Sequence, residues 1–243
     1  MQLQVRHIDR YVERAENEWP LARTHWTKFY LDPGASALKT APARGEARLE
    51  YDALGNGLLF VTEPMAAETE ITGPVAAKLF VSSSTSDADL FLGLHLFAPD
   101  GNELTFLGAN DPNVPVGQGW LRASHRKRDA KKTLPYRPYH THDEIEPLTP
   151  GEPFELDIEI WPTSIAMPRG YRLGLTVRGK DISPDDLPTT IAGTAYKRHA
   201  NIGPFKHHHP QDRPAAIFGG KNALHFDARR QPYLLLPIIP AKG

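Results

Sequence analysis

The stretch Phe154–Trp161, FELDIEIW, decides the fold. Its apolar residues occupy every second position and acidic residues fill the gaps, which is the pattern of a β-strand with one buried and one solvated face. The segment Tyr171–Arg178 alternates in the same way, after a turn signal, MPRG, at residues 167–170. We therefore expect the two segments to form a β-arch or a hairpin near the centre of a sheet.

Further short segments on both sides of this stretch show alternation or an enrichment in β-branched and aromatic residues. They are Trp26–Leu31, Leu58–Thr62, Ala76–Ser82, Leu90–Phe97, Glu103–Leu107, Trp120–His125, Ala223–Phe226 and Tyr233–Ile239. The 23 prolines and 19 glycines fall between them, as turns between antiparallel strands require. Convincing helical periodicity is missing from the sequence. The fold class predicted is all-β, a jelly-roll β-sandwich of the galactose-binding-domain type.

Composition excludes several classes of function. The formal net charge of −1 provides no field that would attract nucleic acid or an anionic membrane, so neither is expected as a partner. The absence of cysteine excludes a disulfide framework, a thiolate metal site and a cysteine nucleophile. No apolar run approaches membrane-spanning length, and residues 1–14 mix charges with single apolar residues. We expect a cytoplasmic protein that carries no cofactor.

Several motifs carry a family resemblance through their order and spacing. They are Trp19–Thr24 (WPLART), Glu70–Val75 (EITGPV), Gly119–Arg126 (GWLRASHR), Gly170–Leu173 (GYRL) and Tyr233–Pro237 (YLLLP). Together they resemble the C-terminal, non-catalytic domain of X-prolyl dipeptidyl-peptidases and cocaine-esterase-like serine hydrolases. The resemblance covers roughly residues 19–240. It implies a galactose-binding-like jelly roll that follows an α/β-hydrolase domain bearing a Ser-His-Asp triad.

This sequence departs from those relatives because it contains no Gly-x-Ser-x-Gly nucleophile elbow. The nearest segment, Gly34–Leu38, lacks the closing glycine, so no residue is assigned a catalytic role. We divide the chain into an N-terminal extension (1–18) and a β-sandwich domain (19–243) with a long irregular loop at 181–222. The resemblance implies an accessory domain that stabilises a hydrolase and helps to form its substrate pocket. Its expected partner is an α/β-hydrolase domain, covalently attached or separate, and homo-oligomer formation is left open.

Aromatic and histidine side chains in the predicted strand Trp120–His125 and in the segment after it are candidates for a substrate pocket or domain interface. They are Trp120, His125, Tyr136, Tyr139, His140 and His142. Such side chains combine an apolar body with a polar tip, which suits a sandwich rim or an interface. Trp120, like Trp19, Trp26 and Trp161, could stack on a sugar or substrate ring, but packing in the core or at an interface explains these residues better.

The interpretation of two residue clusters as metal-binding sites has weaker support. His207, His209 and Asp212 combine imidazoles with a carboxylate in one loop, although adjacent histidines in an extended chain point in opposite directions. Asp87, Asp89 and Asp100 could bind calcium, but turn chemistry explains them better. Two alternative functions therefore stay open: a jelly-roll module that binds carbohydrate or peptide, and a metal-dependent enzyme that uses the histidine clusters.

Overall fold

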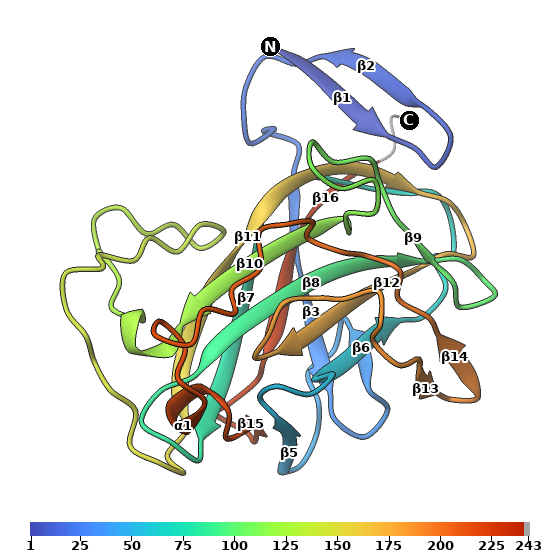
Figure 1. The fold of residues 1–243 in the computed structure, drawn as a ribbon. Helices are drawn as coiled ribbons and strands as arrows, with labels where there is room; N and C mark the ends of the chain where they lie inside the picture. Colours follow the sequence, from blue (N-terminus) through green and yellow to red (C-terminus); the bar gives the residue numbers. More distant parts are fainter. Residues whose placement is uncertain (241–243) are drawn as a thin grey trace.

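The computed structural model describes residues 1–240, whose strands form a large curled sheet that folds into two facing layers (Figure 1). The first layer contains β10 (Gly117–Arg122), β8 (Asp89–Phe97), β12 (Arg172–Arg178), β6 (Leu58–Thr62) and the short β9 (Glu103–Leu104). The second contains β3 (His25–Asp32), β16 (Tyr233–Ile239), β7 (Thr69–Ser83) and β11 (Phe154–Met167). Strand β4 (Ala37–Lys39) joins the layers, because it pairs with β3 on one side and with β6 on the other.

The remaining elements are short. They are β1 (Gln2–Arg6), β2 (Tyr11–Ala15), β5 (Ala47–Asp52), β13 (Thr189–Ile191), β14 (Thr194–Tyr196), β15 (Lys221–Phe226), the 3₁₀ turn η1 (Ala123–His125) and α1 (Ala215–Phe218). Strands therefore dominate the secondary structure, which confirms the prediction of an all-β sandwich. Neither helix within residues 1–240 has the length and hydropathy needed to cross a membrane.

Strand β11 has the alternation that its sequence predicts. Leu156, Ile158 and Ile160 are buried, whereas the acidic residues between them face outward. Strand β11 pairs with β7 and β1, and β12 pairs with β6 and β8, so the connection between β11 and β12 is an arch between layers and not a hairpin. The pairing of β11 with β7 shifts register between Ile160 and Thr163. Pro162 explains this bulge, because it has no N–H to donate to the ladder.

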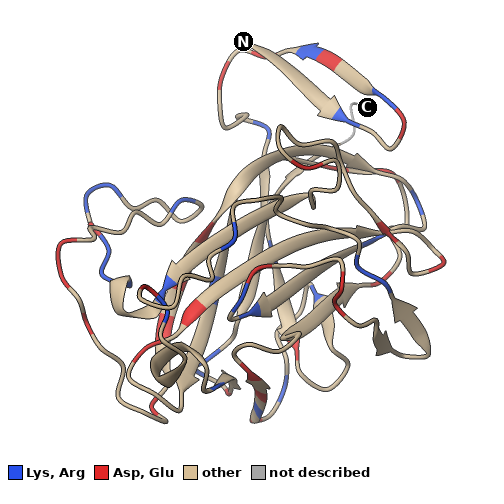
Figure 2. Cartoon of the chain, in the orientation of Figure 1, with Lys and Arg blue, Asp and Glu red and all other residues tan. Residues whose placement is uncertain are grey.

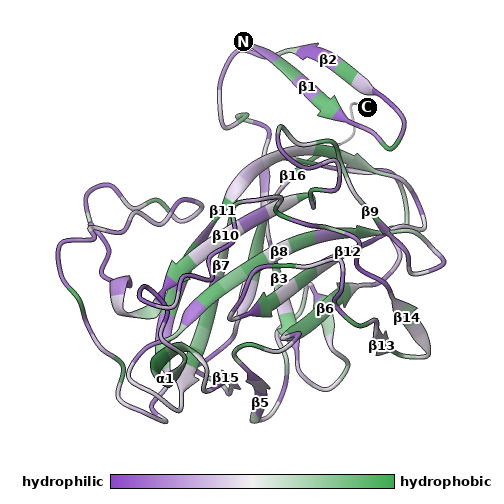
Figure 3. Ribbon diagram, in the orientation of Figure 1, coloured by the Kyte–Doolittle hydropathy of each residue, from purple (hydrophilic) through white to green (hydrophobic). Residues whose placement is uncertain are grey.

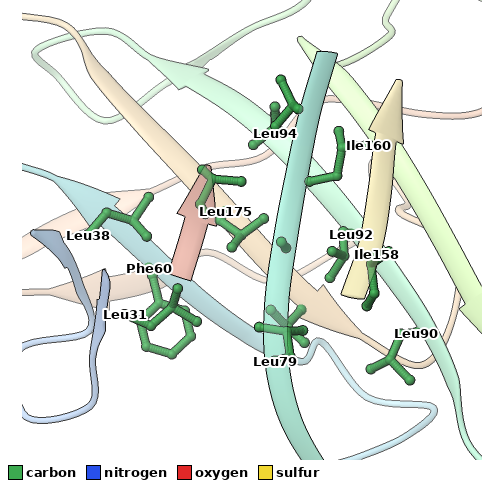
Figure 4. Packing of buried hydrophobic residues seen from close by; sticks show 14 of the residues in the cluster. Leu31, Leu38, Phe60, Leu79, Leu90, Leu92, Leu94, Ile158, Ile160 and Leu175 are labelled. Carbon is green, nitrogen blue, oxygen red and sulfur yellow. The ribbon is translucent and has the colours of Figure 1, made fainter. Parts of the chain in front are cut away.

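The core lies between the two layers, and Figure 4 shows side chains from both layers meeting there. Leu92, Leu94 and Leu175 project from the first layer, and Leu79 and Ile158 from the second. Hydrophobic residues concentrate in the strands of both layers, while the connecting loops are largely hydrophilic (Figure 3). The two layers are therefore held together mainly by burial of apolar side chains, at about 25 cal/mol per Å² removed from water.

Strand β8 is buried on both faces, because the long segment 181–222 covers the outer face of the first layer. Phe97 of β8 packs edge-on against Tyr196 at 5.0 Å between ring centroids, and Phe91 packs against His207 at 5.5 Å. Strands β13 and β14 form a small separate hairpin within this segment. The segment is thus an ordered cover that carries residues such as His207 to the edge of the sandwich.

Two predicted strands end earlier than the sequence indicates. The prediction of a strand over Trp120–His125 was wrong at its end, because the chain turns into η1 after Arg122. The Asp87 carboxylate accepts the backbone N–H of Ser124 at 2.9 Å and fixes this turn. The strand predicted over Glu103–Leu107 is reduced to β9, because the Glu103 side chain binds a neighbouring loop and the chain then folds back to pair Phe106 with Val114.

Residues 1–18 contain the β1–β2 hairpin, which lies above the sandwich in Figure 1. Arg6 of β1 pairs with Ile165 of β11, and its guanidinium donates to the Val116 carbonyl oxygen at 2.9 Å. The hairpin is therefore tied to the edge of the second layer. The predicted domain 19–243 ends in three residues, 241–243, that lie outside the described part, and its galactose-binding-like topology stays a prediction.

Candidate functional site

Two neighbouring hollows share Trp120 and Trp161, where the two ends of the curled sheet meet. Trp120 lies on β10 and Trp161 on the bulge of β11, and their rings meet edge to face at 5.0 Å. Gly119 permits this approach, because a Cβ there would collide with the Glu159 carbonyl oxygen. We call the first hollow the aromatic cleft, lined by Trp19, Trp120, Trp161, Phe205 and their neighbours, and the second the histidine pocket, lined by His125, Tyr139, His140 and His142 together with the two shared tryptophans.

The aromatic cleft has a volume of about 920 Å³ and is largely apolar. Trp161 is 62% exposed and Phe205 is 65% exposed, and Trp19 adds a further ring at 40% exposure. The bulge at Pro162 leaves Trp161 exposed, while the segment 181–222 delivers Phe205 and His207 to the same cleft. Contiguous exposed aromatic surface of this kind is typical of a binding or docking face.

The histidine pocket adjoins the cleft and has a volume of about 610 Å³. The His125 and His142 Nδ1 atoms are 3.2 Å apart, and the His140 ring lies 6.0 Å from that of His142. Burial, reinforced by the neighbouring His142 ring, lowers the pKa of His140 and so favours the neutral form of this imidazole. At the rim, Arg137 approaches Glu159 at 3.7 Å.

The structure brings together five of the six candidates that the sequence indicates. Trp120, His125, Tyr139, His140 and His142 line the histidine pocket, whereas Tyr136 lies elsewhere and stacks on Trp26 at 4.4 Å. Sequence reasoning did not assign Trp19, Trp161 or Phe205 to the site. The Trp161–Pro162 pair was an available signal, because proline within a strand indicates a bulge or an edge.

The weak metal candidates lie close in sequence but bind different partners. The His207 Nδ1 is 3.0 Å from an Asp181 carboxylate oxygen, and the His209 Nδ1 is 3.7 Å from the Asp212 carboxylate. Within residues 1–240, no three His, Asp or Glu side chains already stand close enough together to enclose a metal ion.

The three aspartates considered for calcium have other partners. The Asp87 carboxylate accepts the backbone N–H of Ala88 at 2.8 Å, and that of Asp100 accepts the N–H of Asn102 at 2.9 Å. Asp89 forms ion pairs with Arg122 and Arg213. These contacts are those of turns and ion pairs.

Two hydroxyl–histidine contacts resemble catalytic pairs but are enclosed by protein. Thr176 Oγ1, His95 and Glu103 form a chain with contacts of 2.9 and 2.6 Å, and all three side chains are fully or almost fully buried. A Cβ at Gly93 would lie only 2.7 Å from the His95 Nε2, which leaves no room for a substrate. The Ser82 Oγ is 2.7 Å from the His225 Nε2, but Ser82 is buried between strands. Both contacts therefore satisfy buried polar groups.

Charged residues of both signs are interspersed along the chain (Figure 2). Arg122, which lines the histidine pocket, donates to Asp89 at 2.8 and 3.0 Å, so its charge is largely neutralised. The site as a whole offers aromatic faces and imidazole nitrogens, which suit apolar contacts and hydrogen bonding more than the binding of a strongly charged ligand.

The family model of the X-Pro dipeptidyl-peptidase C-terminal non-catalytic domain matches residues 2–235. The cocaine esterase of a Rhodococcus species is 25% identical over 264 residues, which cover 93% of this chain and 40% of that protein. A CocE/NonD family hydrolase from Staphylococcus aureus shares the fold with a TM-score of 0.81 and 24% identity, over 98% of this chain and 41% of that one.

A more distant structure has the same fold. An aminopeptidase from a marine sediment archaeon of the Thaumarchaeota has a TM-score of 0.65 at 16% identity, over 94% of this chain and 39% of that one. The chain spans between 19% and 40% of the length of the curated relatives it matches. The family match extends over nearly the whole chain and confirms the resemblance in the sequence motifs. This chain belongs to the family of X-Pro dipeptidyl-peptidase C-terminal non-catalytic domains.

Proposed function

We propose that this chain is the accessory β-sandwich of a serine hydrolase of the X-Pro dipeptidyl-peptidase or acyl esterase type, which stabilises the hydrolase domain and forms one wall of its substrate pocket. Family membership and the share of the relatives that the chain spans support a larger functional unit. The observation that carries the proposal is the aromatic cleft, with Trp161 and Phe205 more than half exposed on the surface.

The aromatic cleft supports docking on energetic grounds. Burying a large apolar side chain contributes about 1.5–3 kcal/mol, and interface hot spots are enriched in tryptophan. In the isolated chain, most of the Trp161 and Phe205 surface is in contact with solvent. Much of the free energy that burial of these rings would contribute is therefore still available for binding a partner. A hydrolase domain seated on the cleft would bury both rings.

The burial of two hydroxyl–histidine contacts indicates which domain would cleave the substrate. Among residues 1–240, the hydroxyl–histidine contacts at Ser82 and Thr176 are buried between strands, so bond cleavage is assigned to the hydrolase domain and its triad. The histidine pocket adjoins the cleft and would face the same partner. Its Tyr139 and His125 would then supply hydrogen-bonding groups at the edge of the substrate pocket.

The test is co-expression of this chain with an α/β-hydrolase domain from the same genome. Soluble yield, complex formation and turnover of p-nitrophenyl esters and X-Pro anilides are measured for the wild type, for Trp161→Ser and for Leu187→Ser. Leu187 is the matched control, because it is 71% exposed but lies outside the cleft. We expect Trp161→Ser to weaken the complex by about 30-fold, equivalent to a hot-spot loss of about 2 kcal/mol, and Leu187→Ser to have no effect.

Two results would reject this function. One is hydrolysis by the purified chain alone that is abolished by a serine-directed inhibitor. The other is calorimetric binding of an oligosaccharide or peptide in the cleft with no effect of the chain on the hydrolase, which would favour the binding-module alternative. A cytoplasmic location and homo-oligomer formation stay predictions, to be measured by cell fractionation and analytical ultracentrifugation.

A further inference from the structure

Arg6 brings a positive charge to the aromatic cleft, and the described residues do not neutralise it. It ends strand β1, and its half-buried guanidinium lines the cleft together with Trp161 and Tyr11. Within residues 1–240, no carboxylate forms an ion pair with this guanidinium. Burial lowers the pKa of Arg6, and no carboxylate offsets this effect.

Two other partly buried arginines of the chain show the usual arrangement. Arg14 donates to the Glu70 carboxylate at 2.6 and 2.8 Å, and Arg122 donates to the Asp89 carboxylate at 2.8 and 3.0 Å. A charge that is removed from water without a partner is costly, because nothing replaces the lost hydration. The Arg6 guanidinium therefore has free energy to gain from an anion that enters the cleft.

The fold fixes the orientation of this guanidinium. Its Nη2 donates to the Val116 carbonyl oxygen at 2.9 Å and to the Thr163 Oγ1 at 2.5 Å, and its central carbon lies 4.6 Å from the centroid of the Phe106 ring. These two hydrogen bonds use two of the five N–H groups of an arginine. The other three, on Nε and Nη1, have no hydrogen-bond partner in the described part of the chain and are in contact with solvent. They can donate to a ligand without rearrangement of the fold.

The remainder of the cleft indicates what else the ligand carries. A volume of about 920 Å³ lies at the upper end of the range of about 300–1,000 Å³ for small-molecule sites. The exposed rings of Trp161 and Phe205 provide a surface for an apolar body. Asp111 also lines the cleft, and its carboxylate accepts the backbone N–H of Asn113 at 2.7 Å. This negative charge would repel a second charge on the ligand, so a single carboxylate fits better than a phosphate.

We propose that the aromatic cleft binds a small ionised carboxylic acid, with Arg6 as the anchor of the carboxylate and the aromatic side chains as the surface for an apolar, ring-bearing body. Hydrogen bonds from a guanidinium to a carboxylate are about twice as strong as those between neutral groups. The inference does not depend on the proposed function, because the cation and the rings belong to this chain. It predicts binding by the chain alone, whereas the proposed function is tested on the complex with a hydrolase domain.

The test is an NMR titration of the full chain with phenylacetate at neutral pH and constant ionic strength. Phenylacetamide has the same ring without the charge, and acetate has the charge without the ring. We expect phenylacetate to bind about tenfold or more tightly than either control, since it loses neither the charged hydrogen bonds nor the apolar contact. The Arg6 Nε–H and Trp161 indole N–H resonances should shift together. This comparison uses the wild type only, so it does not depend on the folding of a variant.

Three variants then assign the two parts of the site. Arg6→Gln should lower the phenylacetate affinity by about tenfold or more, to that of phenylacetamide, whereas Trp161→Ser should weaken the binding of both. Arg10→Gln is the matched control and should change neither, because Arg10 lies at the turn of the same hairpin, binds Asp9 and stands outside the cleft.

The ratio of the phenylacetate and phenylacetamide affinities separates recognition of the carboxylate from a structural role of Arg6, which also ties the hairpin to the sandwich. Loss of both affinities by the same factor in Arg6→Gln would assign Arg6 a structural role only and overturn the proposal. An unchanged preference for phenylacetate in that variant would overturn it too. Equal binding of acetate and phenylacetate by the wild type would show simple ion pairing without the aromatic surface, and equal binding of phenylacetamide and phenylacetate would show apolar contact without the anchor; either result contradicts the proposal.

Discussion

Replacing Glu103 by alanine should destabilise the protein more than any exposed carboxylate replacement. The Glu103 Oε1 lies 2.6 Å from the His95 Nδ1, and its Oε2 accepts the backbone N–H groups of His199 and Ala200 at 2.6 and 2.9 Å. Both the His95 and the Glu103 side chains are fully buried. The alanine variant leaves a ring nitrogen and two amides without an acceptor, in a place that water does not reach.

The magnitude follows from these three contacts. A hydrogen bond to a charged group contributes about 1.5–3 kcal/mol, but contacts in one network are not additive. Breaking a buried charged pair typically costs about 3–5 kcal/mol. We expect the free energy of unfolding of Glu103→Ala to fall by about 4 kcal/mol, a large part of the about 5–15 kcal/mol that stabilises a typical domain. Urea denaturation followed by tryptophan fluorescence measures this change.

Hydrogen exchange gives a local readout of the same network. The amide of Ala200 should lose its protection in Glu103→Ala, because the carboxylate is its acceptor. Glu50→Ala is the control, since its carboxylate binds Lys221 at the surface and its loss should leave the urea midpoint unchanged. A fall of less than about 1 kcal/mol in Glu103→Ala with normal protection at Ala200 would refute the reasoning.

The same network predicts a pH dependence. Burial raises the pKa of Glu103, but the His95 charge and the hydrogen bonds from its ring and from two backbone amides outweigh burial, so the pKa lies below its usual 4.5. A carboxyl whose folded-state pKa is lowered stabilises the protein above the unfolded-state pKa, and this contribution is lost as the pH falls through the folded-state value. The difference in stability between the wild type and Glu103→Gln should therefore be constant above about pH 5 and shrink below about pH 4.

Three further replacements test the packing. Ile158→Ala empties a fully buried core position and should lower the unfolding free energy by about 3 kcal/mol in urea, whereas Glu159→Ala on the opposite face should have little effect. Gly119→Ala should lower the midpoint of thermal unfolding sharply, because its Cβ would push β10 away from β11. Arg178→Met leaves the buried Asp186 unpaired and should cost about 3–5 kcal/mol in urea, while adding Asp186→Leu should recover much of that loss.

The period-two alternation of residues 154–161 was sufficient to predict strand β11 and its buried face, because side-chain direction in a strand is a local property. The end of β10 was not predictable in this way. It depends on the Asp87 carboxylate, 37 positions away from Ser124, which accepts the N–H that a longer strand would have used. The short strand β4 was missed for a similar reason, since its three residues carry too little pattern and its pairing partners define it. Strand β5 was also missed, although its sequence, ARLEYD, alternates apolar and charged residues as a strand does.

The candidate site was predicted where its residues are close in sequence and missed where they are distant. His125, Tyr139, His140 and His142 fall within one stretch, and the chain folds that stretch back on itself through the Arg128–His140 bridge. Phe205 reaches the aromatic cleft only because the segment 181–222 packs on β8. A sequence pattern alone carries no signal for that packing.

The buried polar contacts explain how a long irregular segment can position an apolar surface. Glu103 binds the backbone of this segment at His199 and Ala200, and Arg178 holds it at Asp186 through two contacts. Phe205 follows shortly after the Glu103 contact, so its place in the aromatic cleft depends on a carboxylate that never touches the cleft. If that is correct, Glu103→Ala should loosen Phe205 and weaken docking, while Glu50→Ala should not. Fluorine NMR of a labelled Phe205, compared between the two variants, would separate this coupling from a general loss of stability.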